Sequence, residues 1–201
     1  RFDGLFELAE PRPQTPERRS TVHLDRRAAY FRLDRYYRDQ PIVTRILENG
    51  DCSYLLDGET ATDTAARRQY RLDCERNRSF QAFYEFLYGL PMSLNDDYVA
   101  ELIPQAEITE FAGQPAHALR VRLRKAIISD NWRFFFDPDS GRLLGYAYYE
   151  DDAGTRGARL VLHEEAAVEG IRFPRLRSWY DLESGDYLGT DVIVQVSSSS
   201  R

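Results

Sequence analysis

The sequence predicts a mostly β (α+β) fold in which one curved antiparallel sheet of about 10 strands surrounds one central helix, since a long meander of short strands must curl. Aromatic residues make up 13% of the 201 residues, with 13 Tyr and 11 Phe, and such side chains fit the half-buried faces of strands. Short segments of alternating polarity follow one another, separated by turn signals. Residues 75–88 instead show the spacing of an aromatic-rich amphipathic helix.

The clearest predicted element is a β-hairpin over residues 131–149. Each of its strands carries large apolar side chains at every second position, which places them on one face. These are Trp132, Phe134 and Phe136 on the first strand and Leu144, Tyr146 and Tyr148 on the second. Between the strands, residues 137–141 read Asp-Pro-Asp-Ser-Gly. This run combines the fixed φ of proline with the freedom of glycine and therefore predicts a turn.

The remaining strands are predicted from the same alternation. In residues 119–124 apolar side chains alternate with arginine, which indicates one wet face. The other strands of the C-terminal half are predicted at 159–168, 171–180 and 187–196, and those of the N-terminal half at 2–9, 21–25, 28–35, 42–48 and 53–56. Pro174 has no N–H to donate, so its strand is expected to lie at an edge or to be bulged there.

The domain organisation is simple, because no linker or internal repeat divides the chain. Residues 1–201 are expected to form a single domain. Residues 10–19 contain three prolines and are predicted to be a loop. The segment 92–104 is expected to be a second loop, and residues 197–201, rich in serine, a solvated tail.

The predicted helix has recognisable ends. Asp73 is a plausible N-cap, and Glu75 lies in the first turn, where the helix dipole favours an acidic side chain. The run Gly89-Leu90-Pro91 ends the helix. Gly89 suits the left-handed position after the last turn, and Pro91 prevents continuation.

The faces of this helix are unusually apolar. Phe80, Phe83, Tyr84 and Leu87 follow the spacing of one stripe that should lie against the sheet. Phe86 and Tyr88, with Ala82, extend the apolar surface further around the helix. Two interpretations remain open: the helix plugs the mouth of a curved sheet, or it also lines a pocket large enough for a lipid.

The net charge of the chain bears on whether nucleic acid is a partner. The net charge is −6 with a pI of about 5.2, which argues against binding nucleic acid, where clustered cations neutralise phosphates. The cations are nonetheless unusual, because Lys125 is the only lysine and the other 26 are arginine. Either a GC-rich genome or an anion-binding surface explains this choice.

The composition alone does not decide the cellular compartment in which the protein works. No apolar run approaches the ~20 residues that span a bilayer. The chain begins at Arg1 without Met, so an N-terminal signal segment is expected to have been removed. Cys52 and Cys74 are either reduced core thiols or one disulfide.

Motifs for known chemistry are missing from the sequence. It has no nucleophile elbow, no phosphate-binding loop and no zinc-ligand spacing. His163, followed by Glu164 and Glu165, is the nearest approach to a ligand cluster. On a strand His163 and Glu165 share one face while Glu164 points the other way, so a single interaction at the rim is favoured over a metal site. No cofactor is expected.

Four short strings, taken in order, resemble a known superfamily. They are Tyr54-Leu55-Leu56-Asp57-Gly58, Gly89-Leu90-Pro91, Phe134-Phe135-Phe136-Asp137-Pro138 and Val168-Glu169-Gly170-Ile171-Arg172-Phe173-Pro174. Their order is similar to that of the LolA/LolB-like superfamily, in its uncharacterised branch of outer-membrane lipoprotein-sorting-protein-like sequences. The resemblance implies a periplasmic half-barrel, in which helices lid an incomplete antiparallel barrel over an apolar cavity.

These observations lead to one functional expectation with two alternatives. The chain is expected to be an exported bacterial protein, not an enzyme, that binds a lipid, an acyl chain or a lipoprotein in its concavity. The side chains expected to line that concavity are Phe83, Phe86, Leu87, Trp132, Phe134, Tyr146 and Tyr148. The first alternative is a protein-interaction module with a solid core. The second is an enzyme of unfamiliar type that uses His163 or the loop acids. The oligomeric state stays open.

Overall fold

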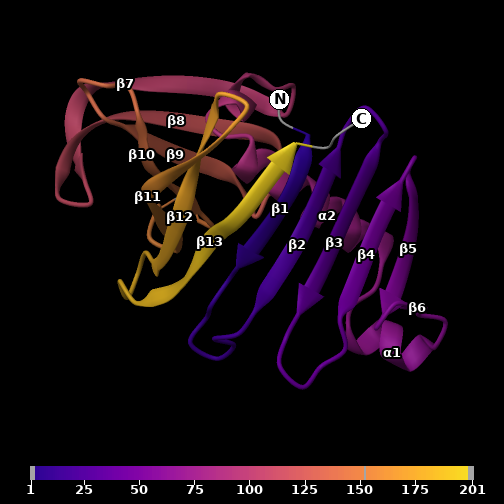
Figure 1. The fold of residues 1–201 in the computed structure, drawn as a ribbon. Coiled ribbons are helices and arrows are strands. Elements are labelled where there is room, and N and C mark those ends of the chain that lie inside the picture. The colour runs from indigo at the N-terminus through magenta and orange to yellow at the C-terminus, as the bar shows by residue number, and fades with distance from the viewer. Residues whose placement is uncertain (1–2, 152, 199–201) are drawn as a thin grey trace.

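The computed structural model describes residues 3–151 and 153–198. Within them, thirteen strands form one antiparallel sheet that bends around a central helix (Figure 1). The strands of the N-terminal half are β1 (Gly4–Ala9), β2 (Arg19–Asp25), β3 (Tyr30–Tyr36), β4 (Val43–Glu48), β5 (Asp51–Leu56) and β6 (Glu59–Thr60). Those of the C-terminal half are β7 (Val99–Phe111), β8 (Gln114–Ile127), β9 (Ser129–Phe136), β10 (Leu143–Tyr149), β11 (Gly157–Val168), β12 (Ile171–Asp181) and β13 (Tyr187–Ser198). The predicted fold class is confirmed.

The order of the strands explains why a helix crosses the sheet. Two meanders, β1 to β6 and β7 to β13, join where β13 pairs with β1. Strands β6 and β7 are therefore the two edges of the described sheet, although they are neighbours along the chain. The segment between them contains α1 (Thr64–Gln69), α2 (Cys74–Tyr88) and the short 3-10 helix η1 (Met92–Asn95). This segment crosses from one edge to the other, and Figure 1 shows α2 behind β2, β3 and β4.

Register shifts interrupt the ladders where the sheet curves. They occur in the pairs β1–β13, β9–β10, β12–β13, β8–β9 and β7–β8. Each such bulge bends its strand and increases the local twist, so the sheet curves into a half-barrel. The pairing of β12 with β13 ends at Leu176 and Val192. Pro174 lies beyond this point and pairs only towards β11, opposite Glu165, which confirms its expected place at a local edge.

The hairpin over residues 131–149 is confirmed, since Asn131 pairs with Tyr149 across β9 and β10. In its turn the carboxylate of Asp137 accepts a hydrogen bond from the backbone N–H of Ser140 at 2.7 Å. Gly141 takes a positive φ of 67°. The short polar turn therefore forms as its residue types predict.

Two predictions about the chain's irregular segments were wrong, and one helix was not predicted. Much of the segment 92–104 is not a loop but η1 and the start of β7. Its alternation was hidden because β7 is an edge strand with a register shift between Pro104 and Ile108, and Ile108 is 59% exposed. Helix α1 was not predicted. The expected tail starts later, because Ser197 pairs with Leu5, and residues 199–201 lie outside the described residues. The loop predicted over residues 10–19 connects β1 and β2, except that Arg19 is already the first residue of β2.

Helix α2 begins and ends close to the predicted residues, but its C-terminal cap has a different conformation. The side chain of Asp73 accepts a hydrogen bond from the N–H of Arg76 at 2.7 Å, as an N-cap does. Gly89, however, has a right-handed conformation with φ of −88°, so the expected left-handed cap is wrong. Glycine is needed there for space, because a Cβ would lie 2.6 Å from the carbonyl oxygen of Glu85 and 3.2 Å from the Cβ of Ser93.

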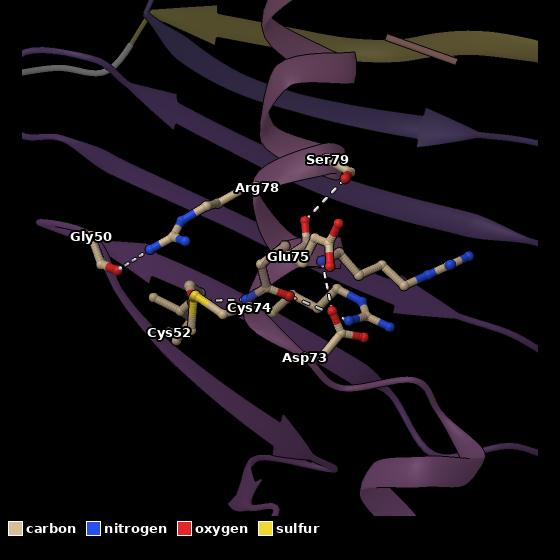
Figure 2. Close-up of a disulfide and its surroundings, with 11 residues drawn as sticks. Gly50, Cys52, Asp73, Cys74, Glu75, Arg78 and Ser79 are labelled. Carbon is tan, nitrogen blue, oxygen red and sulfur yellow. Dashed lines mark hydrogen bonds between the residues drawn. A yellow bond between two sulfur atoms is a disulfide. The ribbon is translucent and has the colours of Figure 1, made fainter. Parts of the chain in front are cut away.

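A disulfide between Cys52 and Cys74 attaches the first turn of α2 to β5 (Figure 2). The two Cα atoms are 5.6 Å apart, and the bridge spans 22 positions of the sequence. Beside it, Arg78 donates a hydrogen bond to the carbonyl oxygen of Gly50 at 3.3 Å. The alternative of two reduced thiols is therefore excluded in this structure, and the N-terminal end of α2 is tied to one side of the sheet.

Candidate functional site

Most of the side chains expected to line a cavity lie in the closed core. Phe86, Leu87, Trp132, Phe134 and Tyr146 are each at most 1% exposed. The ring of Phe86 lies edge-on to that of Trp132, with centroids 5.3 Å apart, and to that of Phe134 at 6.2 Å. The helix thus plugs the concavity at this end, as the first interpretation of its faces expected.

The other two predicted residues are only half-buried. Tyr148 packs on Trp132 at a centroid distance of 5.4 Å. Phe83 stacks on Trp179 with centroids 6.4 Å apart, and its other side faces an open groove. Phe80 is likewise half-buried. Phe80 and Phe83 both pack against the core, as the predicted stripe expected, but they are less deeply buried than Tyr84 and Leu87.

The groove runs along the N-terminal half of α2 and has a volume of about 1410 Å³. Its lining comes from the residue before β2, from the end of β3, from α1, α2 and the link between them, from Tyr98, and from the end of β8 with the residue that follows it. The lining residues are Arg18, Arg35, Tyr37, Thr64, Arg67, Arg68, Arg71, Leu72, Asp73, Glu75, Arg76, Arg78, Ser79, Phe80, Ala82, Phe83, Tyr98, Lys125, Ala126, Ile127 and Ile128. This groove is the candidate site.

One end of the groove is strongly basic. Seven of the lining residues are arginine, Lys125 lies towards the other end, and two lining residues, Asp73 and Glu75, are acidic. The whole chain carries a net charge of −6, so the groove has the opposite sign to the molecule. A concave surface of one sign concentrates ligands of the other.

The centre of this basic region is the ring of Phe80, with three guanidinium groups around it. The guanidinium carbons of Arg35, Arg45 and Arg76 lie 5.0, 5.2 and 5.6 Å from its centroid. Cations over an aromatic face are attracted by its quadrupole. They also repel one another: burial first, and then Arg35 and Arg76, lower the pKa of Arg45 to about 10.

Arg45 is held in place by neutral acceptors. Its guanidinium donates hydrogen bonds to the carbonyl oxygens of Tyr70 at 2.7 Å and Arg71 at 3.0 Å, and to the amide oxygen of Asn77 at 3.3 Å. Asn77 is fully buried and donates in turn to the carbonyl of Ile46 on β4 at 3.1 Å. This network fixes the distance between α2 and strand β4 of the sheet.

Arg35 belongs to a second network behind the groove wall, centred on the buried carboxylate of Glu10. The carboxylate accepts hydrogen bonds from Ser20 at 2.5 Å and from Arg18 at 3.2 Å. Arg35 lies 3.8 Å from the same carboxylate and donates to the hydroxyl of Tyr84 at 2.7 Å. Burial opposes ionisation of Glu10, but Arg35 and Arg18 outweigh it and lower its pKa to about 2.

The other end of the groove is mainly apolar. Phe83, Tyr98, Ile127 and Ile128 line it, with Lys125 at its border. Ile128 is 47% exposed and has a φ of +63°, a conformation that a β-branched side chain rarely adopts. The backbone thus holds an isoleucine side chain open to the groove at a cost in strain.

Sequence reasoning found Phe83 but missed the basic residues of the groove. The sequence did contain a signal for these basic residues, since five arginines lie between residues 67 and 78 and the chain uses almost no lysine. It was not decisive, because arginines on solvated helix faces are common and the position of α1 was unknown.

The residues weighed for catalysis are not assembled into a site. His163 is exposed on β11, and its acidic neighbours face arginines: Glu164 lies 3.0 Å from Arg175, and Glu165 lies 3.3 Å from Arg172. Within residues 3–151 and 153–198, no group of three or more metal-binding side chains occurs. None of the helices in the same ranges has both the length and the hydrophobicity of a transmembrane segment.

Solved structures of three proteins share this fold. A domain described as an outer membrane lipoprotein-sorting protein domain, from Vibrio parahaemolyticus, is 12% identical with a TM-score of 0.52, over 98% of this chain and 84% of its own. A LolA superfamily protein from Nitrosomonas europaea is 9% identical with a TM-score of 0.57, over 100% and 86%. A DUF1329 family protein from Desulfovibrio piger is 11% identical with a TM-score of 0.53, over 98% and 84%.

At these identities the likeness shows the fold alone, and at that level it confirms the resemblance to the LolA/LolB-like superfamily. No curated protein matches the chain. In sequence, the model of the family of unknown function DUF6503 matches residues 1–196.

Proposed function

We propose that this chain, which belongs to the DUF6503 family, is a non-catalytic carrier that shelters an acyl chain of a lipid or lipoprotein in the groove along α2. The observation that carries the proposal is the groove itself. Its volume of about 1410 Å³ exceeds the roughly 300–1,000 Å³ of a typical small-molecule pocket. A large open groove with an apolar end suits a long, flexible ligand.

The apolar end supplies the affinity. Each CH₂ group removed from water there contributes about 0.8 kcal/mol, and Phe83, Ile127 and Ile128 offer the surface that replaces water. Phe86, Trp132 and the other closed-core residues named from the sequence reach a ligand only if α2 leaves the core. Their role in binding stays a prediction.

The relatives support the same class of function. One solved structure of this fold is described as a lipoprotein-sorting domain, and another belongs to the LolA superfamily. We extend this to the present chain because its groove lies on the concave face, where α2 crosses the half-barrel.

Export from the cytoplasm is part of the proposal. The disulfide between Cys52 and Cys74 supports it, since disulfides persist in oxidising compartments and are rare in the cytosol. A carrier of acyl chains is needed where such chains must pass through water, as they do between two membranes.

Helix α1 is the element best suited to move when a ligand enters or leaves. It is six residues long and buries none of its side chains. Its Arg67 lies over the ring of Tyr54 at 5.1 Å, and Arg45 binds the carbonyls at its end. Elements with few buried contacts open at low cost, so α1 would act as the lid at the basic end.

The test uses N-phenyl-1-naphthylamine, a neutral dye whose fluorescence rises in apolar surroundings, displaced by monopalmitoylglycerol. The wild type is expected to bind the dye and to release it on addition of the acylglycerol. Phe83→Asn makes the apolar end polar and is expected to weaken dye binding at least about tenfold. Native mass spectrometry of protein from its own host should show a copurified acyl-chain ligand.

The matched control is Val194→Ser, which removes an apolar side chain that is 61% exposed on β13 and outside the groove lining. It should bind the dye as the wild type does. If Phe83→Asn keeps full affinity while its circular dichroism spectrum is unchanged, the groove is not the binding site and the proposal fails.

A further inference from the structure

The basic end of the groove has more positive charge than the fold needs. Among the described residues, no ion pair joins Arg67, Arg68, Arg71 or Arg76 to an acid. Of the two acidic lining residues, Asp73 already accepts the hydrogen bond that caps α2. A surface cation needs no partner by itself, but here several converge on one concave wall.

Arg76 also occupies a position where a positive charge destabilises the helix. It follows Cys74 and Glu75 in the first turn of α2, where the partial positive charge of the helix N-terminus repels a cation. Its guanidinium instead lies over Phe80, beside those of Arg35 and Arg45. Three like charges around one ring repel one another; Glu10 offsets part of this charge beside Arg35, and an anion seated beside Arg76 would offset more of it.

The chemistry of the guanidinium group indicates which kinds of anion this end of the groove would bind. Its planar fork of donors matches phosphate and carboxylate oxygens in pairs, and it is less strongly hydrated than an ammonium group. Arg35 and Arg76 both line the groove, and Arg71 lies on the same wall. The neighbouring α1 adds Arg67 and Arg68, so five arginines line the part of the groove where the phosphate would bind.

We propose that the arginines lining the basic end of the groove, Arg35, Arg71 and Arg76, bind the anionic phosphate headgroup of an amphiphile whose acyl chain lies along Phe83 towards Ile127 and Ile128. This rests on the proposed function and names its ligand class: an anionic phospholipid, not a neutral or zwitterionic one. The rings of Phe80 and Phe83, one turn apart on α2, mark the boundary between the headgroup and the chain.

The test measures four probes by isothermal titration calorimetry, below the concentration at which the lipids form micelles. Palmitoyl lysophosphatidylglycerol carries the acyl chain and a net negative headgroup. Palmitoyl lysophosphatidylcholine and monopalmitoylglycerol carry the same chain on a zwitterionic and a neutral headgroup. Glycerol phosphate carries the anion without the chain. The wild type is expected to bind the first probe about tenfold or more tightly than each of the other three.

The informative variants are Arg76→Gln and Arg71→Gln, both at exposed positions. Each is expected to weaken binding of lysophosphatidylglycerol about tenfold, because it removes a charge-assisted hydrogen bond. Binding of monopalmitoylglycerol should stay within about twofold of the wild type. Arg27→Gln is the control, since Arg27 is exposed in the turn after β2 and outside the groove.

The outcomes separate this inference from the function on which it rests. Equal affinity for the three acyl probes overturns anion recognition and leaves the carrier proposal intact. Equal affinity for glycerol phosphate and lysophosphatidylglycerol shows a site for a free phosphate and overturns the amphiphile. If none of the acyl probes binds, the carrier proposal itself fails. An equal loss in Arg27→Gln and Arg76→Gln shows general electrostatic attraction and overturns the site.

Discussion

Replacing Glu10 by glutamine tests whether its buried carboxylate holds the β1, β2 and β3 strands and α2 together as an ion. Glu10 is 2% exposed and receives hydrogen bonds from Ser20, Arg18 and Tyr84. Glutamine keeps the size of the side chain but removes the charge that faces Arg18 and Arg35. The variant therefore isolates the electrostatic contribution from packing.

The size of the expected loss in folding free energy follows from the pKa of Glu10. Burial raises this pKa, but Arg35 and Arg18 lower it by a larger amount, so the pKa falls overall from 4.5 to about 2. At 1.36 kcal/mol for each pKa unit, this difference corresponds to about 3 kcal/mol of folding free energy at neutral pH. Because the pKa of the folded state lies below that of the unfolded state, the contribution is complete above about pH 5. It is lost as the pH falls from about 4.5 to about 2.

The assay is urea denaturation of the wild type and Glu10→Gln, followed by tryptophan fluorescence from pH 7 to pH 2.5. The variant is expected to be about 3 kcal/mol less stable at pH 7, with the difference shrinking steadily below pH 4.5. Glu17→Gln in the same loop is the control. Its ion pair with Arg38 is exposed and should contribute less than about 1 kcal/mol. A Glu10→Gln difference that does not change with pH would refute the reasoning.

Three further changes probe packing and covalent constraint. Phe86→Ala, at a fully buried position, should lower the free energy of unfolding by about 3–5 kcal/mol in urea titrations. The double variant Cys52→Ser/Cys74→Ser should lose about 3 kcal/mol in the same assay, given a bridge over 22 positions. Gly145→Ala should cost about 1–3 kcal/mol and lower the melting temperature, because its Cβ would lie 2.3 Å from the carbonyl oxygen of Leu160.

The elements that could be predicted are those whose residues form local patterns. The hairpin of β9 and β10 was found because its inward side chains alternate on both strands and its turn residues are unambiguous. Helix α2 was found because Asp73 caps it and its aromatic residues recur at helical spacing. In both cases the signal lies within about 20 residues of chain, so no knowledge of the rest of the fold is needed.

The parts that could not be predicted depend on contacts between distant segments. Arg177 is 1% exposed, although its strand shows no sign of a buried charge, because its guanidinium lies 4.1 Å from the ring centroid of Tyr88. Glu10 appeared to be a loop residue, yet it is buried against Arg35 and Tyr84 from other elements. The groove likewise needs α1, which no hydrophobic pattern marks, because it buries no side chain.

The position of the groove follows from the way in which α2 crosses the sheet. The chain must pass from the edge at β6 to the edge at β7, so the helix enters at one margin and sinks into the core near the other. At its start, the disulfide to β5 and the contact of Asn77 with Ile46 hold it above the sheet. Towards its end, Phe86 and Tyr88 are enclosed.

A helix tilted in this way leaves Phe80 and Phe83 only partly covered. Phe80 and Phe83 continue the stripe that buries Tyr84 and Leu87, so a sheet closing evenly on α2 would have buried them as well. Arginine side chains stand over Phe80, and no apolar element of the described chain covers the groove side of Phe83. A fold that exposes apolar rings beside converging cations, and fixes that arrangement with a disulfide and a buried asparagine, favours an occupant with both a charged head and an apolar chain.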